Sequence, residues 1–330
     1  MPVDPWLASR PAGAFARRYG RAPAASAWAP GSVLCLRGTG EAANEALFLS
    51  LPLGARVFVA PRDDASHRCA CEGEAPPRGP GEAPAAPSHD DEVARVVAAL
   101  RASGLEAPGL DVLIAHDLPG RTGFGTGAAR RVALVRAIAA LQRVSLDDAQ
   151  VAAIASRDGG GALPRLSEIA AACGQSGHWL LVDATSGRAT VVPMPDTAEI
   201  ALVTSGAWRR PGSRGPYAAV SVVDSSRIHA ATRALHASAL QTVGALMQHL
   251  PGGDGAADEA DRRAEFAWAD PRVYGARAWR AQHAGGILAL CRRGAARDVA
   301  RRVLARGGEP WVLLPGGHGG PPASGGDRAS

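Results

Sequence analysis

The sequence contains no lysine, so all 36 of its positively charged residues are arginine, and it contains one asparagine, Asn44. Alanine, glycine and proline are abundant, a combination typical of GC-rich coding. The formal charge of +5 therefore reflects composition rather than a nucleic-acid partner. The arginines are scattered among acidic residues and form no basic stripe, so we expect no nucleic-acid binding.

Cysteine and long apolar runs are scarce as well. Five cysteines in 330 residues form no disulfide framework, and an odd count leaves at least one thiol unpaired. Met1–Gly20 has no apolar run of signal-peptide length, and no other stretch approaches the roughly 20 apolar residues of a membrane helix. We expect a cytoplasmic protein that does not bind membranes.

The residues that are present predict two folded domains, because 330 residues exceed one comfortable core and 46% of them are hydrophobic. Two polar segments rich in proline and glycine, Glu72–Glu92 and Gly316–Ser330, are expected to be mobile and to contribute nothing to a core. Strands are predicted at Ser32–Leu36, Ala55–Ala60, Trp179–Asp183, Ile200–Thr204 and Gly286–Cys291. Helices are predicted at Asp91–Ala102, Gly127–Gln142, Leu146–Ser156, Asp224–Leu250 and Ala295–Arg306.

Five local motifs follow the order and wording of galactokinases, from near the first residue to past Leu290. They are Phe15–Gly20, Trp28–Gly31, Pro61–Asp64, Gly177–Asp183 and Asp270–Arg277. The last, DPRVYGAR, matches the galactokinase approach to its third motif almost letter for letter. The chain therefore resembles the galactokinase branch of the GHMP small-molecule kinases.

The resemblance implies an α+β, two-domain GHMP kinase fold with the site in the cleft between the domains. Residues 1–195 are expected to form a ribosomal-protein-S5-like domain, with a mixed sheet, helices on one face and a glycine-rich loop at a helix start. Residues 196–330 are expected to form a ferredoxin-like domain with a disordered tail from about residue 316.

The glycine-rich run Asp117–Ala129 resembles the family loop that binds nucleotide phosphates. Glycines permit close backbone approach, and the free N–H groups of the following helix attract an anion. The residues expected to bind the nucleotide are Pro119, Gly123, Gly125, Thr126 and Gly127. Two of the three family serines are glycine here, so Thr126 is the only hydroxyl left in the run for a metal, magnesium is doubtful, and ATP binding is expected to be weak or vestigial. The alternative, a strand-to-helix turn kept for folding, stays open.

The positions that would carry kinase chemistry are replaced. The arginine that follows A-P-G in galactokinases corresponds to Ser32, and the aspartate of G-I-M-D-Q corresponds to Ser167. Glu168 points about 100° away from the required direction on a helix and is expected to be solvated. Arg37 lies too far along its strand to substitute for the arginine, and Arg280–Gln282 replaces three glycines of the closing loop.

Several other residues have structural explanations. Tyr217 matches a sugar-contacting tyrosine of the family only weakly, and packing is the favoured role. The residues His67, Cys69 and Cys71 share one face of an extended segment but have no second pair at zinc-site spacing. His116, which precedes the glycine loop, is the one histidine retained as a candidate.

Two functions remain open. One is an active sugar kinase, dependent on ATP and magnesium, that phosphorylates the anomeric hydroxyl of galactose. The other is a catalytically impaired or inactive relative that keeps the fold as a nucleotide- or sugar-binding or interaction module, with an unidentified protein partner. Ser32 and Ser167 favour the second, because phosphoryl transfer depends on positioning and charge stabilisation.

Overall fold

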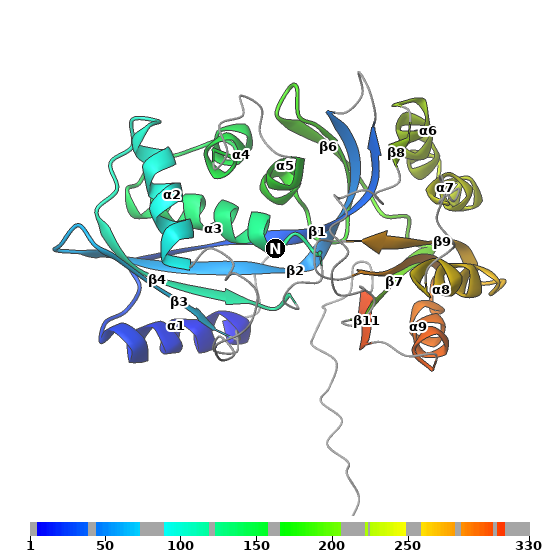
Figure 1. Ribbon diagram of the computed structural model, residues 1–330, viewed down its shortest axis with the longest axis horizontal. Helices are drawn as coiled ribbons and strands as arrows, with labels where there is room; N and C mark the ends of the chain where they lie inside the picture. The colour runs from blue at the N-terminus through cyan, green and yellow to red at the C-terminus, as the bar shows by residue number, and fades with distance from the viewer. Residues whose placement is uncertain are drawn as a thin grey trace, which may run out of the picture.

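The computed structural model of the protein contains two β-sheets that lie side by side along its long axis, with helices packed against both (Figure 1). The structure describes residues 5–38, 44–72, 89–118, 123–157, 166–205, 222–223, 225–248, 259–280, 285–305 and 309–313. None of the helices in these ranges is both long and apolar enough to cross a membrane.

The first sheet has seven strands, and its longest pair forms a hairpin-like antiparallel ladder. The strands are β1 (Ala25–Gly38), β2 (Glu45–Arg62), β3 (His67–Glu72), β4 (Gly109–His116), β5 (Trp179–Asp183), β6 (Arg188–Val192) and β8 (Val222–Val223). Their order is β3-β4-β2-β1-β8, and β5 pairs with both β2 and β6. The predicted strands Ser32–Leu36 and Ala55–Ala60 are confirmed within β1 and β2, and Trp179–Asp183 is β5 itself.

Five helices cover this sheet. They are α1 (Pro5–Tyr19), α2 (His89–Arg101), α3 (Thr126–Leu141), α4 (Asp148–Ala155) and α5 (Leu166–Cys173). Helices α2 to α5 lie on one face, whereas α1 lies on the other, so the expectation of helices on a single face is wrong (Figure 1). The reason is a second apolar face on the sheet, where Phe15 of α1 packs against Phe58 and Leu113.

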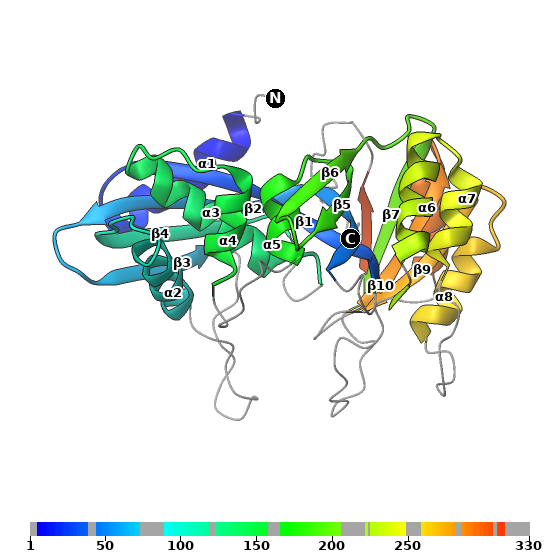
Figure 2. The same ribbon diagram turned by 90° about the horizontal axis from the view of Figure 1, so that it is seen from above.

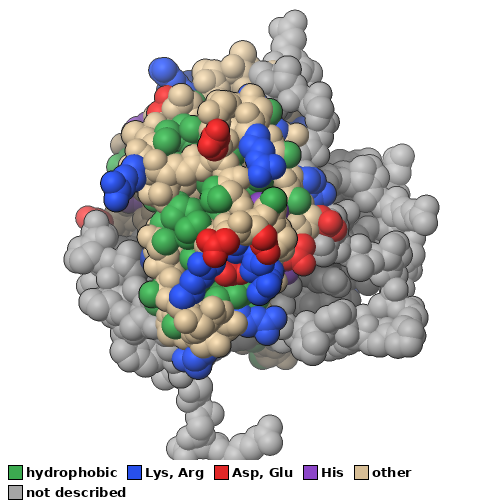
Figure 3. All heavy atoms as spheres, turned by 90° about the vertical axis from the view of Figure 1, so that its left-hand side faces the viewer, with side chains coloured by type: hydrophobic (Ala, Val, Ile, Leu, Met, Phe, Trp, Pro, Cys, Tyr) green, Lys and Arg blue, Asp and Glu red, His purple; other side chains and the backbone are tan. Residues whose placement is uncertain are grey.

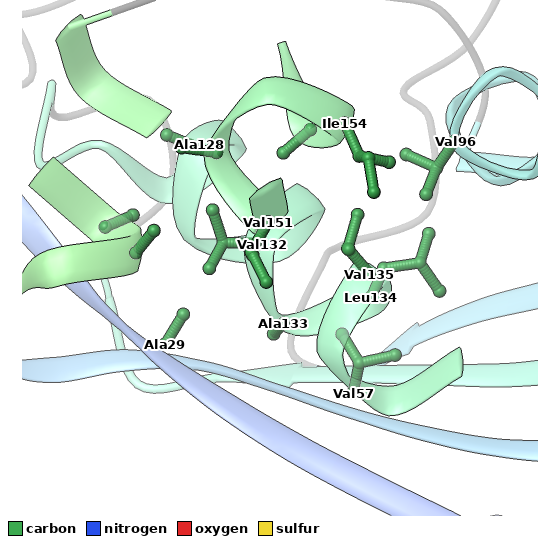
Figure 4. Close-up of a cluster of buried hydrophobic side chains, with 14 of the residues drawn as sticks. Ala29, Val57, Val96, Ala128, Val132, Ala133, Leu134, Val135, Val151 and Ile154 are labelled. Carbon is green, nitrogen blue, oxygen red and sulfur yellow. The ribbon is translucent and has the colours of Figure 1, made fainter. Parts of the chain in front are cut away.

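The main core lies between the sheet and α3. Figure 4 shows side chains of α3, among them Val132 and Leu134, between Ala29 and Val57 of the strands and the neighbouring helices. Because α3 is apolar on nearly every side, it is a buried helix that other elements surround. Its first turn is thereby fixed in position.

The segment Glu72–Glu92 differs from its prediction at both ends. Glu72 ends β3, and His89–Glu92 forms the first turn of α2, where acidic side chains favour a helix start. Glu92 is buried, with 6% of its surface exposed, because it pairs with arginines of α3. The remainder of this segment and the tail from about residue 316 lie outside the described residues.

The second sheet is antiparallel, in the order β11-β7-β10-β9. Its strands are β7 (Ala198–Ser205), β9 (Val273–Arg280), β10 (Gly285–Arg292) and β11 (Glu309–Leu313). The helices around it are α6 (Ser225–His236), α7 (Leu240–Met247), α8 (Glu259–Trp268) and α9 (Ala296–Leu304). All four lie at the same end of the molecule (Figure 1), and the view from above shows α6, α7 and α8 there as well (Figure 2). The predicted elements Ile200–Thr204, Gly286–Cys291 and Ala295–Arg306 correspond to β7, β10 and α9.

The predicted long helix Asp224–Leu250 is wrong, because the chain forms α6 and α7 instead. Ser238 adopts a left-handed conformation with φ 54°. The Ala239 N–H donates to the Ala234 carbonyl over 2.8 Å, the bond that typically closes a helix end. The break allows Ile228 of α6 and Val243 of α7 to enter one core.

Candidate functional site

The glycine loop leads directly into α3, as the sequence predicts. Gly125 immediately precedes the helix and has left-handed angles, φ 68° and ψ 21°, which a glycine adopts without strain. Among the residues that the structure describes, no side-chain hydrogen bond caps this end of α3. The N–H groups of the first turn therefore lack a side-chain acceptor, an arrangement that suits an anion.

Ser32 of β1 lies against this loop. Its N–H donates to the carbonyl of Phe124 over 2.9 Å, and a Cβ placed on Gly125 would lie 3.1 Å from the Ser32 Oγ. Only 3% of Ser32 is exposed. The fold thus brings together Ser32, Gly125 and the start of α3, and the side chain at position 32 is a short neutral hydroxyl.

A second buried serine lies beside Ser32. Ser50 of β2 is opposite Ser32 in the strand register and is fully buried, and its Oγ has no hydrogen-bond partner among the described residues. A Cβ on Gly174, which follows α5, would lie 2.8 Å from this Oγ. Ser167 is half-buried at the opposite end of α5, about 10 Å from Gly174 at 1.5 Å per helical residue.

Glu168 contradicts its prediction as a solvated residue. It is 1% exposed, and its Oε1 accepts a hydrogen bond from Nη2 of Arg131 on α3. Its other oxygen, Oε2, is buried and has no hydrogen-bond partner among the described residues. The turn of about 100° from Ser167 directs Glu168 toward α3 rather than toward water. A signal was available: α3 is mostly apolar, yet its first two turns contain Arg130 and Arg131, which favour acidic partners nearby.

Glu92 of α2 completes this cluster. Its Oε2 lies 3.0 Å from Arg130 Nη2, and its Oε1 lies 3.5 Å from Arg131 Nη1. Burial raises the pKa of Glu92, but a hydrogen bond with His89 and the two guanidinium groups lower it more, so the net pKa is below the ordinary value. Glu92 is therefore ionised at neutral pH. Sequence reasoning placed it in a mobile segment and missed it.

The guanidinium group of Arg131 lies over the first turn of α3. A Cβ on Gly127 would be 3.4 Å from Arg131 Nη1 and 4.0 Å from Nη2. This follows from helix geometry, because side chains point back toward the N-terminus and reach the residue four positions earlier. Arg131 therefore stands beside Thr126 and Gly127, at the helix end of the glycine loop.

His116 lies at the strand end of the same loop. Its Nδ1 is 2.9 Å from the Leu118 carbonyl oxygen, and a hydrogen bond with Cys71 of β3 raises the pKa of His116 more than its burial lowers it. The Cys69 side chain lies two residues before Cys71 on this strand, and burial raises the pKa of its thiol. No cluster of three or more His, Cys, Asp or Glu side chains in the described part of the chain is placed to hold a metal ion.

The remaining candidates are separate from the loop or not described. Arg37 lies about 17 Å from Ser32 along β1, at roughly 3.3 Å per residue, which is too far to replace an arginine at position 32. Pro119, Tyr217 and the closing-loop residues Ala281–Gln282 lie outside the described residues. On the face shown in Figure 3, arginine and acidic side chains are interspersed, as the sequence predicts.

Comparison with known proteins gives a consistent result. Residues 91–174, from α2 through the glycine loop to the end of α5, match the model of the GHMP kinases N terminal domain. No curated protein matches the sequence significantly.

Several solved structures share the fold. Lactococcus lactis galactokinase, crystallised with galactose, superposes with a TM-score of 0.74 at 16% identity over 94% of this chain and 98% of the other. Leishmania major mevalonate kinase, in complex with R-mevalonate, has a TM-score of 0.58 at 17% identity over 89% of this chain and 97% of the other. Mevalonate diphosphate decarboxylase from Staphylococcus aureus has a TM-score of 0.61 at 11% identity over 88% and 97% of the two chains.

At these identities the superpositions establish the fold, while the domain match covers the segment that contains the glycine loop. The two-domain α+β architecture expected from the sequence is confirmed. Residues 91–174 are therefore similar to the N-terminal domain of GHMP kinases, and the chain shares its fold with galactokinase and mevalonate kinase.

Proposed function

We propose that the protein binds the phosphate groups of a nucleotide at Gly123–Gly127 and is catalytically impaired or inactive as a galactose kinase. In this proposal the protein is a cytoplasmic nucleotide- or sugar-binding or interaction module, with domains at residues 1–195 and 196–330. The observation that carries it is the position of Ser32. This neutral, buried side chain contacts the glycine loop where the resemblance to galactokinases implies an arginine.

The proposed binding rests on the backbone of the loop. Gly125 has the left-handed conformation, and the first turn of α3 has no side-chain cap, so its N–H groups are available to oxygen acceptors. Thr126 is the only hydroxyl-bearing side chain between Gly123 and Gly127. We therefore propose ATP as a weakly bound ligand.

The proposed loss of catalysis rests on two neutral side chains. Removing one charge-stabilising group from a phosphoryl-transfer site costs roughly 10²–10³ in rate, and removing a positioned acid or base costs roughly 10²–10⁴. Ser32 and Ser167 supply neither a cation nor a carboxylate. Together these losses are large enough to reduce turnover to background.

A coupled assay with galactose and ATP tests this proposal. We expect turnover at background, and we expect the double variant Ser32→Arg plus Ser167→Asp to remain there, because Arg280–Gln282 still replaces three glycines of the closing loop. Isothermal titration with ATP, then with galactose, separates binding from chemistry. Robust turnover by the unmodified chain would contradict the proposal.

One observation favours the alternative, an active ATP-dependent sugar kinase. Glu168, one residue from Ser167, is a buried carboxylate paired with the partly buried cation Arg131, and its Oε2 has no partner among the described residues. If turnover is detected, Glu168→Gln should abolish it, whereas Ser167→Ala should leave it unchanged. In that case Glu168 is the acid-base group.

A further inference from the structure

We infer that the guanidinium group of Arg131 takes the place of a divalent cation at the glycine loop, so that a phosphate ligand binds there without magnesium. The inference rests on the proposed phosphate binding and specifies how the ligand's charge is balanced. It starts from the observation that Arg131 lies over Gly127 rather than pointing into water.

The first step is the position of the charge. Arg131 Nη1 and Nη2 lie 3.4 and 4.0 Å from the place of a Cβ on Gly127. An oxygen ligand at residue 127 would have to extend into this space, so the guanidinium occupies the volume a metal-binding side chain would need. Arginine binds phosphate through planar, forked N–H donors, and its charge is permanent at physiological pH.

The second step is the state of the nearby carboxylates. Magnesium binds oxygen ligands, usually including one or two carboxylates, in a near-octahedral arrangement. Glu168 and Glu92 are the carboxylates beside Arg131, and the guanidinium contacts both of them. These ion pairs hold Arg131 in place and engage the carboxylate oxygens that a magnesium ion would need as ligands. The residues present therefore do not fit a magnesium ion.

The third step is the unused oxygen of Glu168. Oε2 lies in a side chain that is 1% exposed, and it has no hydrogen-bond partner among the described residues. Leaving such an oxygen unsatisfied is costly unless a ligand completes it. The other oxygen is bound to Arg131 over the first turn of α3, so Oε2 is an unmet acceptor beside the loop. A nucleotide carries both phosphate and hydroxyl groups.

Titrations of the full chain with ATP, in EDTA and in excess magnesium, test the inference. We expect the wild-type affinity to differ less than about threefold between the two conditions. Arg131→Gln should lower the affinity in EDTA about tenfold, and magnesium should restore part of the loss because Glu168 is released, whereas Glu92 stays paired with Arg130. Arg136→Gln is the matched control, because Arg136 is on the same helix but pairs with Asp148 at 2.6 Å.

A second measurement needs no nucleotide. Mn²⁺ titration followed by electron paramagnetic resonance should detect a new binding site in Arg131→Gln that is absent from the wild type. If Arg131→Gln does not fold, as judged by circular dichroism, Arg131→Lys retains the charge and should remain independent of magnesium with reduced affinity for ATP.

The outcomes separate the two proposals. If the wild type binds neither ATP nor tripolyphosphate, the proposed function fails, and Mn²⁺ binding alone decides the inference. Wild-type affinity for ATP that collapses in EDTA overturns the inference, as does Mn²⁺ binding that is the same in the wild type and in Arg131→Gln. The inference is also overturned if the affinity of Arg131→Lys for ATP collapses when EDTA removes magnesium.

Discussion

Arginines contact a buried carboxylate both beside the glycine loop, at Glu168, and at the turn between α8 and β9, at Asp270. In the second cluster, Asp270 is 3% exposed and both of its oxygens are bonded. Its Oδ1 accepts from the Arg272 N–H at 2.9 Å and Nε at 3.1 Å, and its Oδ2 accepts from Arg272 Nη2 at 2.9 Å and from Arg302. The arginine side chains are 40% and 48% exposed.

The cluster at the loop is different in both respects. Glu168 is equally buried, but one of its oxygens has no described partner, and the side chain of Arg131 is only 16% exposed. A saturated carboxylate with solvated arginines serves to fix the turn before β9 against α9. An unsaturated carboxylate with a partly buried arginine beside a helix start is suited to receive a ligand. The difference between the clusters is therefore a difference between structure and binding.

The largest expected effect is on the stability of the loop cluster. Arg131→Ala should lower the free energy of unfolding by about 3–5 kcal/mol, because it leaves Glu168 as an uncompensated buried charge. Arg302→Ala should lower it by only about 0–1 kcal/mol, because that arginine is half exposed. Urea denaturation of both variants measures the two changes. The double variant Arg131→Ala plus Glu168→Ala should be more stable than Arg131→Ala alone; equal costs for the two single variants would remove the contrast between the clusters.

A smaller effect is expected at Gly125. Alanine there has to adopt a left-handed conformation, which costs about 1–2 kcal/mol, and its Cβ would press on the Ser32 Oγ at 3.1 Å. Gly104→Ala is the control, since Gly104 also has a positive φ but no atom within 4 Å of the added Cβ. We expect both variants to lose stability and only Gly125→Ala to lose affinity for ATP. An equal loss of affinity in both would show that the loop does not bind the ligand.

The smallest effect is the pH-dependent contribution of Asp270. The hydrogen bond from Arg272 is the main reason that the pKa of Asp270 falls to about 2. Because this pKa is depressed, the stabilisation is complete above the unfolded value near 3.9 and disappears as the pH falls toward about 2. Asp270→Asn should therefore cost about 1–2 kcal/mol at pH 7, after allowance for solvent screening, and progressively less below about pH 4.

Denaturation of the wild type and Asp270→Asn at several pH values between about 7 and 3 measures this difference. The affinity of Asp270→Asn for ATP should be unchanged, since Asp270 is saturated by Arg272 and Arg302. If the difference in the free energy of unfolding between the wild type and Asp270→Asn grew as the pH fell, the depressed pKa of Asp270 would be contradicted.

Local patterns predicted the framework well. The apolar run of α3, the glycines before it and the strand Trp179–Asp183 are each predicted by their own local sequence. Features that depend on distant partners were not accessible. The sequence around Glu168 predicts an exposed polar helix residue. Its burial depends on the hydrogen bond from Arg131, which lies 37 positions earlier in the chain. Nothing in the neighbourhood of Glu92 shows that Arg130 will bury it.

The break at Ser238 illustrates a second limit. Periodicity continues through Asp224–Leu250, so a single helix satisfies the local pattern. The observed bend is favoured because two short helices bring Ile228 and Val243 into the same apolar cluster, a gain that depends on the second sheet. Helix propensity is a weak preference compared with such burial.

The short strand β8 has a consequence for the order of assembly. Val222 and Val223 pair with Arg37 and Gly38 of β1 in parallel, so an edge of the first sheet is completed by a segment made much later during synthesis. Ser225 and His229 then contact Glu45, the latter at 3.2 Å. Until Val222 and Val223 emerge from the ribosome, β1 of the nascent chain has an unpaired edge. Such an edge can pair with strands of other chains. Truncation before residue 222 should therefore yield an aggregation-prone product rather than an independent N-terminal domain.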